Sequence, residues 1–584
     1  MAQWYVQNKK ADFAAWAKTY GIDPVTARII RNREIKEGEE LRLFLKGTRE
    51  DLYDPALLYG AEDLVAILRE KIKEQKRIRI IGDYDIDGVM SSYILVQALS
   101  RVGALVDVQI PHRIEDGYGL NGKLVEDAYE AGIDTILTCD NGIAAIEEIA
   151  RAKELGMTVL VTDHHEIPYE MEGEEKRYIR SQADAIVNPH QRECTYPFKD
   201  LCGAVVAWKV MQLLYRRLGR DERELDAYLE NAAFATVGDI MDLRGENRIL
   251  VQEGLKRIHH TTNLGMRALI AHCGLEPSRI ESYHFGYVLG PCVNASGRLD
   301  TAKRALELFL EEDPAKASVI AEELVALNEE RKSMTAEGTR LALERAKEYQ
   351  GDKVLVIYLP EVHESIAGII AGRVREACYK PVFILTDTEN GVKGSGRSIE
   401  EYSMFEEMNQ AADLMTKFGG HPMAAGLSLP RENVEAFRKR LNEACKLTEQ
   451  DLEEKVHIDV PMPMSYASEA LVEELERLAP FGKGNPRPLF AEKNLKVYSL
   501  RLVGKESNVA QLTLRTSDGH LVKAVCFRNA AGFLDYLADR FGEEELAAAK
   551  RGDANAIELA VVYTARLDHY RDNTTLKFEI QYYK

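Results

Sequence analysis

The sequence predicts an α/β protein with a parallel sheet, a long helix, a second α/β region and a C-terminal antiparallel β-barrel. Between about residues 60 and 240, short apolar runs such as RIRIIGD and TVLVTD alternate with segments of helical periodicity, which is typical of βαβ units. Residues 313–350 carry apolar side chains at three-to-four spacing with no proline after Pro314, as in one long helix or two closely joined ones. The last part of the chain alternates apolar and polar residues between turn signals, as small barrels do.

These changes of pattern divide the chain into five regions. With 584 residues the chain exceeds what one hydrophobic core usually spans, so several domains are expected. We predict an N-terminal segment (1–60), a parallel-sheet domain (61–310), a linker helix (311–350), a second α/β domain (351–452) and a β-barrel of the OB-fold type (453–584).

Composition excludes several classes of protein. No apolar run approaches the ~18 residues of a membrane span, and the N-terminus has no signal-peptide pattern, so a cytoplasmic protein without a membrane partner is expected. The eight cysteines form no C-x-x-C pair, which argues against a zinc ribbon and a disulfide framework. The net charge of −19 is unusual for a protein that binds nucleic acid, although a local basic channel and divalent metals can still hold a strand.

The strongest local pattern is a run of three aspartates at alternate positions after an apolar strand: Asp83, Asp85 and Asp87. In an extended chain these carboxylates point the same way, and three close anions favour a divalent cation. A solvated acidic turn is the plain alternative. A calcium EF-hand loop is excluded, because its twelfth position requires Glu where this chain has Ile94, and because a strand precedes the motif instead of a helix.

Two further predicted strands end in residues of the same kind. The run TILTC leads into Asp140, and TVLVT leads into Asp163, His164 and His165. Each motif alone could be a helix N-cap or an ordinary loop. Together they converge on the carboxyl edge of one parallel sheet, where open α/β sheets place their sites. Asp239, at the end of a helical segment, is a fifth candidate.

The residue types indicate which metal and which chemistry. Oxygen ligands with one or two imidazoles and no thiolate suit Mn²⁺ or Mg²⁺ better than structural zinc. More carboxylates are present than one ion requires, which favours two ions sharing a carboxylate. Such a pair stabilises the attacking and leaving oxygens in phosphoryl hydrolysis. The residues themselves therefore predict a binuclear phosphohydrolase.

The motifs also resemble a known family. DYDIDG, TCDNG, TDHHE and VGD are similar, in this order, to the four signature motifs of the DHH phosphoesterase superfamily. HRIEDGYGL, GPCVNASGRL, GSGRS and FGGHPMAAGLS are similar to segments of the RecJ exonucleases within it. The resemblance extends from about residue 30 onward. It implies that the first α/β region is a DHH catalytic domain, the second a DHHA1 domain and the barrel an OB-fold that binds nucleic acid.

The resemblance also implies roles for individual residues. Metal ligands would be Asp85, Asp87, Asp140, His164 and Asp239, with Asp140 bridging the ions. Asp83 would be a ligand or close partner that acts in catalysis with Asp140 and with His165, which would face the scissile phosphate. A pocket for a 5′ terminal phosphate would involve Arg113, Arg298, Ser395, Arg397 and His421. Outside these motifs, an isolated arginine is more often a solvated surface residue.

The implied activity is 5′→3′ hydrolysis of single-stranded DNA to 5′-mononucleotides in DNA repair and recombination, with two Mn²⁺ or Mg²⁺ ions. A monomer with a helicase and a single-strand-binding protein as partners is expected. Two alternatives are a nano-RNase or cyclic-dinucleotide phosphodiesterase of the same superfamily and a non-catalytic replication scaffold. Cys292 stands where family members usually carry arginine, which can weaken one phosphate contact, and VGDIMDL departs from the commoner VAD-x-x-P-L.

Overall fold

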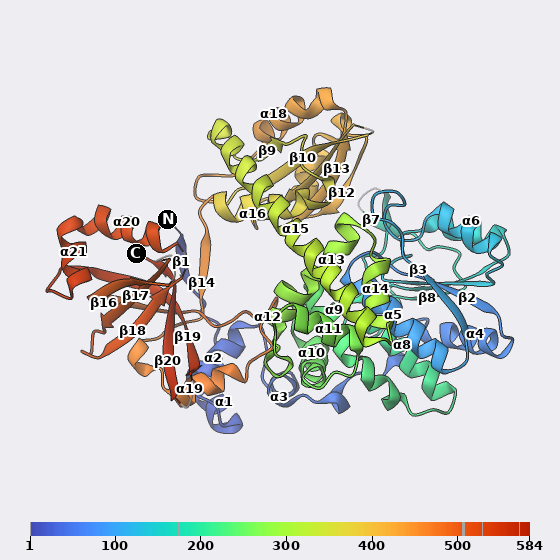
Figure 1. Ribbon diagram of the computed structural model, residues 1–584, viewed down its shortest axis with the longest axis horizontal. Coiled ribbons are helices and arrows are strands. Elements are labelled where there is room, and N and C mark those ends of the chain that lie inside the picture. Colours follow the sequence, from blue (N-terminus) through green and yellow to red (C-terminus); the bar gives the residue numbers. More distant parts are fainter. Residues whose placement is uncertain (1, 173–174, 390, 505–507, 528, 571–572) are drawn as a thin grey trace. The chain divides into compact units, whose positions relative to one another are not determined.

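The computed structural model describes residues 2–172, 175–389, 391–504, 508–527, 529–570 and 573–584. The chain forms two compact units (Figure 1). The first comprises Leu52–Met241 and Ile249–Glu454, and the second combines Ala2–Asp51, Asp242–Arg248 and Lys455–Lys584. Within the described residues, no helix is both long and apolar enough to span a membrane.

A five-stranded, fully parallel sheet forms the core of the first unit, as predicted. Its strand order is β3-β2-β4-β5-β8. The strands are β2 (Arg77–Ile81), β3 (Leu105–Gln109), β4 (Thr135–Cys139), β5 (Thr158–Thr162) and β8 (Ala185–Val187). The central strands are rich in Ile, Val and Leu and are almost wholly buried, because helices cover both faces of a parallel sheet.

Helices connect and cover these strands. Around the sheet lie α4 (Ala61–Lys73), α5 (Ile86–Arg101), α6 (Gly122–Glu130), α7 (Ile146–Glu154) and α8 (Gly203–Arg217). A helical layer follows, with α9 (Leu229–Gly238), α10 (Gly245–Ile258), α11 (Leu264–His272), α12 (Ser282–His284), a π-helical turn (Phe285–Leu289), α13 (Gly290–Leu299) and α14 (Lys303–Leu310). A small hairpin, β6 (Tyr169–Glu172) and β7 (Glu175–Tyr178), projects after β5.

One helix, α15 (Pro314–Ala346), spans 33 residues and confirms the predicted linker. It begins where Asp313 accepts a hydrogen bond from the Ala315 amide, with proline in the first turn. In Figure 1 it leads from the helices around α13 to the second α/β region. At 1.5 Å per residue it is about 50 Å long.

The second α/β region contains a mixed five-stranded sheet of order β12-β13-β11-β10-β9. Only β9 and β10 are parallel, and the other pairings are antiparallel. The strands are β9 (Leu355–Tyr358), β10 (Val382–Thr388), β11 (Gly391–Arg397), β12 (Lys417–His421) and β13 (Ala424–Leu429), and the main helices are α16 (Ala367–Cys378), α17 (Met404–Asn409) and α18 (Val434–Ala444).

The second unit contains the predicted barrel, closed by pairing between β16 and β19. Its strands are β15 (Val460–Pro461), β16 (Phe490–Val503), β17 (Val509–Arg515), β18 (Leu521–Cys526), β19 (Glu558–Tyr570) and β20 (Asn573–Tyr583). Three helices accompany it: α19 (Glu469–Glu476), α20 (Ala530–Phe541) and α21 (Glu543–Arg551). This arrangement is consistent with an OB-fold.

The N-terminal residues fold with the barrel and not with the parallel sheet that follows them in sequence. β1 (Gln3–Val6) pairs in parallel with β14 (Lys455–Ile458). The helices α1 (Phe13–Tyr20), α2 (Pro24–Asn32) and α3 (Glu39–Lys46) contribute Trp16, Ile30 and Phe44 to the same hydrophobic cluster as the barrel strands. Local periodicity gave no sign of this long-range packing.

Candidate metal centre and phosphate pocket

The three aspartates after β2 lie on a strand-to-helix turn. The strand ends at Ile81, Asp85 caps α5, and Asp87 lies in the first turn of that helix. Asp85 Oδ1 accepts hydrogen bonds from the amides of Asp87 and Gly88 at 3.0 and 3.1 Å. The prediction that all three carboxylates lie along one extended strand is therefore wrong. They converge because the chain turns tightly into the helix.

Gly88 permits this tight turn. A Cβ atom at this position would lie 2.4 Å from the Asp83 carbonyl oxygen and 2.5 Å from its amide nitrogen. Any larger residue would push Asp83 away from the other carboxylates. Asp87 is held from a second direction, since its two carboxylate oxygens accept hydrogen bonds of 2.6 and 2.8 Å from the Gly203 and Ala204 amides at the start of α8.

The other predicted ligands approach from three more elements. Asp140 follows β4 and adopts a left-handed backbone with φ 60°. His164 follows β5 by two residues, and Asp239 caps the C-terminus of α9. His164 Nε2 lies 3.1 Å from Asp140 Oδ1, 3.5 Å from Asp87 Oδ2 and 3.7 Å from Asp239 Oδ2. Residues distant in sequence thus meet at the carboxyl edge of the sheet.

These side chains form three overlapping groups of potential metal ligands. In each group the ligand atoms lie within 4.8 Å of one another: Asp83, Asp85 and Asp140; Asp87, His164 and Asp239; and Asp140, His164 and His165. The contact between Asp140 and His164 joins them. The arrangement provides two neighbouring positions for divalent cations, with Asp140 between them, and it places Asp83 among the ligand atoms.

The electrostatics of the cluster fit bound cations. Burial and the charges of Asp87 and Asp85 raise the pKa of Asp140 well above its usual range, and burial with the charge of Asp85 does the same for Asp83. Asp83 Oδ1 is buried without a hydrogen-bond partner among the described residues. Burial lowers the pKa of His164, which favours the neutral imidazole that binds metals. Oxygen donors with imidazole suit Mn²⁺ or Mg²⁺.

His165 lies beside the cluster and is oriented by two residues whose roles the sequence did not reveal. Asp163 Oδ1 is 2.8 Å from His165 Nδ1, and the Tyr118 hydroxyl is 3.1 Å from His165 Nε2. Burial lowers the pKa of His165, but the Asp163 hydrogen bond and charge outweigh it and raise that pKa to about 9. A protonated His165 can face an anionic phosphate.

Asp163 and Tyr118 each also hydrogen-bond to the backbone of loops that carry predicted metal ligands. Asp163 accepts hydrogen bonds from the amides of His164 and Ile143, which holds the loop after β5 against the loop after β4. The Tyr118 hydroxyl donates to the Asp140 carbonyl oxygen at 3.1 Å. Asp163 was visible in the DHH motif as a carboxylate, whereas nothing in the local pattern marked Tyr118.

Two of the residues predicted to bind a phosphate, Arg113 and Ser395, line one cavity of about 870 Å³. Arg298 and Arg397 do not line it, but each contacts a residue that does. Arg298 Nη1 donates to the carbonyl oxygen of the lining residue Ser365 at 2.7 Å, and Arg397 Nη1 lies 3.4 Å from Ser395 Oγ. Further lining residues are Tyr84, Tyr118, Lys393 and Lys417.

The arginines at this cavity are close enough to repel one another. Burial lowers the pKa of Arg298 to about 10, and the charges of Arg113, Arg331 and Arg397 contribute. Burial likewise lowers the pKa of Arg397. The Arg113 guanidinium lies 4.5 Å from the centre of the Tyr84 ring, next to the aspartate motif. A bound anion would relieve this repulsion, as a terminal phosphate does.

Two sequence predictions fall outside this cavity. His421 is exposed at the end of β12, in register with Ala424, the β13 residue that pairs with Arg397. Cys292 is 1% exposed, with its Sγ 3.8 Å from Cys273 Sγ and hydrogen-bonded by Asn328 of α15. Its thiol therefore lies in the interior, and the weaker phosphate contact expected from Cys292 stays a prediction.

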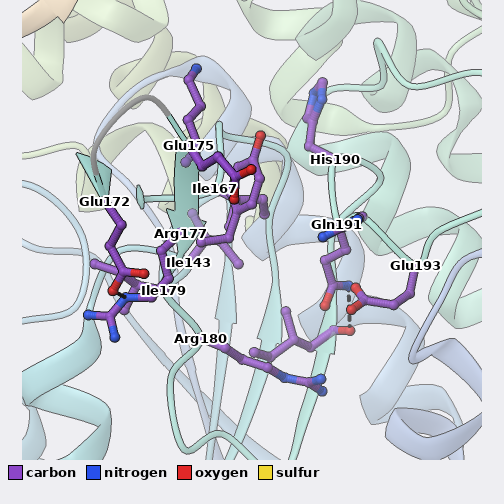
Figure 2. A pocket seen from close by; sticks show the side chains of 14 residues that line it. Ile143, Ile167, Glu172, Glu175, Arg177, Ile179, Arg180, His190, Gln191 and Glu193 are labelled. Carbon is purple, nitrogen blue, oxygen red and sulfur yellow. Dashed lines mark hydrogen bonds and ion pairs between the residues drawn. The ribbon is translucent and has the colours of Figure 1, made fainter. Parts of the chain in front are cut away.

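A second cavity of about 600 Å³ lies between the β6–β7 hairpin and the segment after β8. Figure 2 shows Glu172 and Arg177 paired on one side of it, 3.1 Å apart, and His190, Gln191 and Glu193 on the other. None of the predicted site residues lines it among the described positions. Its mixed charges give no clear ligand preference.

The aromatic residues of the barrel fall into a buried group and an exposed group. Tyr563 and Phe578 are 0% and 4% exposed and belong to the core, so they cannot stack on bases. Tyr498 and Phe527 are 48% and 50% exposed. Arg515 lies over the Tyr498 ring and Lys577 over the Phe527 ring, 5.7 and 5.0 Å from the ring centres. The side chain of Tyr570 lies outside the described residues.

Comparison with known proteins agrees with this organisation. The model of the DHH family, N-terminal domain, matches residues 77–236, that of the DHHA1 domain matches residues 351–447, and that of the RecJ OB domain matches residues 458–582. A crystal structure of RecJ in complex with Mn²⁺ from Thermus thermophilus matches with TM-score 0.80 and 27% identity, covering all of this chain and 79% of that one.

Curated relatives match over most of the chain. The single-stranded-DNA-specific exonuclease RecJ of Escherichia coli (strain K12) is 33% identical over 531 residues, covering 87% of this chain and 89% of that protein. The protein of the same name from Bacillus subtilis (strain 168) is 34% identical, and the match covers 89% of this chain but 65% of the relative's own length. With its acidic metal centre and its three matching domains, the chain belongs to the RecJ family.

Proposed function

We propose that this chain is an exonuclease that degrades single-stranded DNA from its 5′ end and releases 5′-mononucleotides. Relatives of this length carry the name single-stranded-DNA-specific exonuclease. The observation that carries the proposal is the adjacency of two sites of opposite charge. A buried carboxylate cluster that suits divalent cations lies next to a cavity lined by Arg113, Lys393 and Lys417, although Glu364 of the lining pairs with Lys393. Arg298 and Arg397 contact residues of that lining.

The two sites would bind different parts of the strand, its terminal phosphate and its first phosphodiester bond. Arg113, Arg298, Ser395 and Arg397 supply charge-assisted hydrogen bonds to a terminal phosphate, which fixes the 5′ end of the strand. Tyr84 and Tyr118 line the cavity between these groups and the carboxylates. The first phosphodiester bond then lies nearest the metal ligands, so one nucleotide is released in each cycle.

At the metal centre the chain orients the reacting groups. Two divalent cations, Mn²⁺ or Mg²⁺, held by Asp83, Asp85, Asp87, Asp140, His164 and Asp239, supply activation of water and stabilisation of the leaving oxygen. Asp163 Oδ1 holds His165 Nδ1 at 2.8 Å, and the imidazole would donate a hydrogen bond to the phosphate. The Tyr118 hydroxyl lies 3.2 Å from His165 Nδ1 and 3.1 Å from Nε2, so it contacts the ring without selecting one nitrogen.

A specificity for dinucleotides is less well supported. The barrel and its exposed Tyr498 and Phe527 give the chain a second surface, which a dinucleotide would not need. A scaffold without activity is also disfavoured, because all predicted ligand types are present and gathered. Long single strands are therefore the favoured substrate.

We also propose that the protein is a monomer that acts with a helicase and a single-strand-binding protein. In DNA repair and recombination, a helicase would open the duplex and supply single strands to this enzyme. Light scattering measures the oligomeric state, and the rate on strands coated with a single-strand-binding protein, relative to bare strands, measures cooperation.

Digestion of end-labelled strands tests the function. Purified protein with Mn²⁺ is incubated with single-stranded and duplex DNA and RNA, each labelled at the 5′ or the 3′ end. Single-stranded DNA should release a labelled mononucleotide first from the 5′ end, and EDTA should stop the reaction until Mn²⁺ or Mg²⁺ is added. Full activity in EDTA, or release first from the 3′ end, would contradict the proposal.

A further inference from the structure

The most exposed large hydrophobic side chains of the described residues lie directly after α9 and in the run 282–289, which packs against α9. They are Tyr287, Ile240 and Tyr283, which are 73%, 67% and 59% exposed. Tyr283 and Tyr287 stack on each other, with ring centres 5.1 Å apart and planes inclined by 24°. Exposed rings that are already stacked form a flat surface and lose little freedom when another ring joins them.

The chain between the two tyrosines is anchored to α9. Phe285 is buried, with its ring centre 5.1 Å from that of Phe234 in α9. A Cβ atom on Gly286 would lie 3.5 Å from Val237 Cγ1. Val237 precedes Asp239, the candidate ligand at the end of α9, by two residues. The tyrosines therefore project from a fixed turn beside the metal centre.

Ile240 lies beside one of the candidate metal ligands in the sequence. It directly follows Asp239 and is 67% exposed. Its backbone is left-handed, with φ 57°, which is a strained conformation for a β-branched residue. Such strain on an exposed apolar residue has no evident role in folding, and strained residues tend to occur at functional sites.

The helical run Ser282–Leu299 connects this surface to both parts of the active site. Along it, Tyr283, Tyr287, Asn294 and Arg298 are exposed or half-buried, whereas Phe285, Leu289, Val293 and Ser296 are buried. Asn294 Oδ1 accepts a 2.8 Å hydrogen bond from the Ile86 amide, between Asp85 and Asp87. Arg298 lies at the phosphate cavity.

One run thus presents three features in order: a phosphate-binding arginine, a contact to the metal-ligand turn, and the tyrosine stack. At 1.5 Å per residue, the stack begins about 10 Å from Asn294 and ends about 16 Å from it. A strand whose terminal phosphate lies near Arg298 and whose scissile bond lies at the metal ligands would continue away from Arg298, along the helical run toward Tyr287. Stacked nucleotides rise about 3.4 Å each, so about three to five nucleotides reach the tyrosines.

We propose that Tyr283 and Tyr287 form a base-stacking platform for the part of the strand on the 3′ side of the scissile phosphate. The inference rests on the proposed exonuclease function and adds a substrate subsite to it. Stacking on aromatic rings accepts every base, so the platform holds the strand without sequence preference. It would keep the strand aligned while the terminal nucleotide is removed.

The test compares substrates of two lengths. The double variant Tyr283→Ala, Tyr287→Ala is assayed on 5′-phosphorylated thymidine strands of about 3 and about 20 nucleotides. The platform predicts a rise in KM of about tenfold or more for the long strand and less than about twofold for the short one, with kcat unchanged. The double variant Tyr283→Phe, Tyr287→Phe should restore the native KM, because phenylalanine also stacks.

Tyr129→Ala is the matched control, since this tyrosine of α6 is also half exposed, at 50%. It should leave both KM values unchanged. A similar rise in KM for both lengths, or no rise for the long strand, would overturn the platform. Strands with abasic sites at nucleotides three to five give a further measure. The native protein should bind them more weakly than intact strands, whereas the alanine variant should bind both with the same affinity.

Binding without turnover separates this inference from the proposed function. Strands with 2-aminopurine at nucleotides three to five are titrated with protein in EDTA, and stacking is followed as loss of fluorescence. The native protein should quench this probe and the alanine variant should not. If quenching depends on the tyrosines but no strand is digested with metal, the exonuclease proposal alone fails. Equal quenching by both proteins would refute the platform.

Discussion

Asp140 combines three properties that disfavour folding. It is buried, its backbone is left-handed, and four neighbouring aspartates raise its pKa. A left-handed non-glycine residue costs on the order of 1 kcal/mol or more. A buried carboxylate among other carboxylates adds to this cost unless cations are bound. Asp140 is thus better explained by metal binding than by stability.

Replacing Asp140 by alanine should therefore separate activity from folding. Hydrolysis should fall by more than about 100-fold, because both cation positions lose a shared ligand. The melting temperature in EDTA should stay the same or rise, since like-charge repulsion is relieved. Steady-state rates and thermal unfolding measure the two effects. The exposed carboxylate Glu130→Ala serves as control, and activity within tenfold of the parent would contradict the assignment.

Arg397 offers a test of strand polarity. Loss of a hydrogen bond to a charged group costs about 1.5–3 kcal/mol, or roughly 10- to 150-fold in kcat/KM. Arg397→Ala should impose this loss on 5′-phosphorylated strands and much less on 5′-hydroxyl strands. Arg431→Ala, an exposed arginine of the same region, should affect neither. Equal slowing of both substrates would remove Arg397 from the phosphate site.

The junction between α16 and β11 shows how two elements shape the phosphate site. Ser395 and Arg397 alternate on β11 and so point to the same face of the sheet. They lie against the first turn of α16, where backbone amides favour anions. Gly368 in that turn permits the close approach, because a Cβ there would be 2.7 Å from Ser395 Oγ and 2.9 Å from Arg397 Nη2.

Gly368→Ala should displace both side chains without unfolding the domain. We expect kcat/KM on 5′-phosphorylated strands to fall about tenfold or more, with a smaller effect on 5′-hydroxyl strands. Gly372→Ala is the matched control one turn later, since its Cβ would approach Arg397 Cγ only to 4.0 Å. That variant should keep native kinetics. If the two variants behave alike, the contact at Gly368 does not shape the site.

In the whole chain, the second unit draws on three separate segments. Arg33, at the end of α2, pairs with Asp459, at 2.5 Å between Nη1 and Oδ1, and both side chains are 4% exposed. Arg248 is buried against Phe44 and donates to the Phe44 and Leu478 carbonyl oxygens at 2.9 and 2.6 Å. A deletion of the barrel alone would leave these groups unpaired and the N-terminal helices without their core.

The contribution of the barrel should therefore be tested with a fragment comprising residues 52–454 that carries Arg248→Ala, because the fragment keeps Arg248 but loses its carbonyl partners on Phe44 and Leu478. Circular dichroism and thermal unfolding must first show that it is folded. It should retain metal-dependent turnover at saturation, because the metal ligands all lie within it. Its KM for long single strands should rise and become more sensitive to salt, since stacking and phosphate contacts of the barrel are lost. Unchanged affinity would make the barrel a structural or partner-binding module.

Much of the fold and part of the metal centre could be read from local patterns. Strand runs, the long helix and the barrel alternation depend on residues within a few positions of one another. The motifs around Asp85, Asp140 and His164 are recognisable because each follows a predicted strand, and a parallel sheet brings such ends to one edge. The metal class followed from these features, whereas the domain types and the nuclease family followed from the resemblance of the motifs to the RecJ exonucleases.

Only the tertiary structure decided which residues meet across long separations. It brought Asp239 to His164, placed Tyr118 on His165 and paired the N-terminal segment with the barrel. It also buried Tyr563 while exposing Tyr498, Tyr283 and Tyr287. These outcomes depend on packing between elements that are tens or hundreds of residues apart. Periodicity within one segment describes which side chains share a face, but it carries no information about what that face will contact.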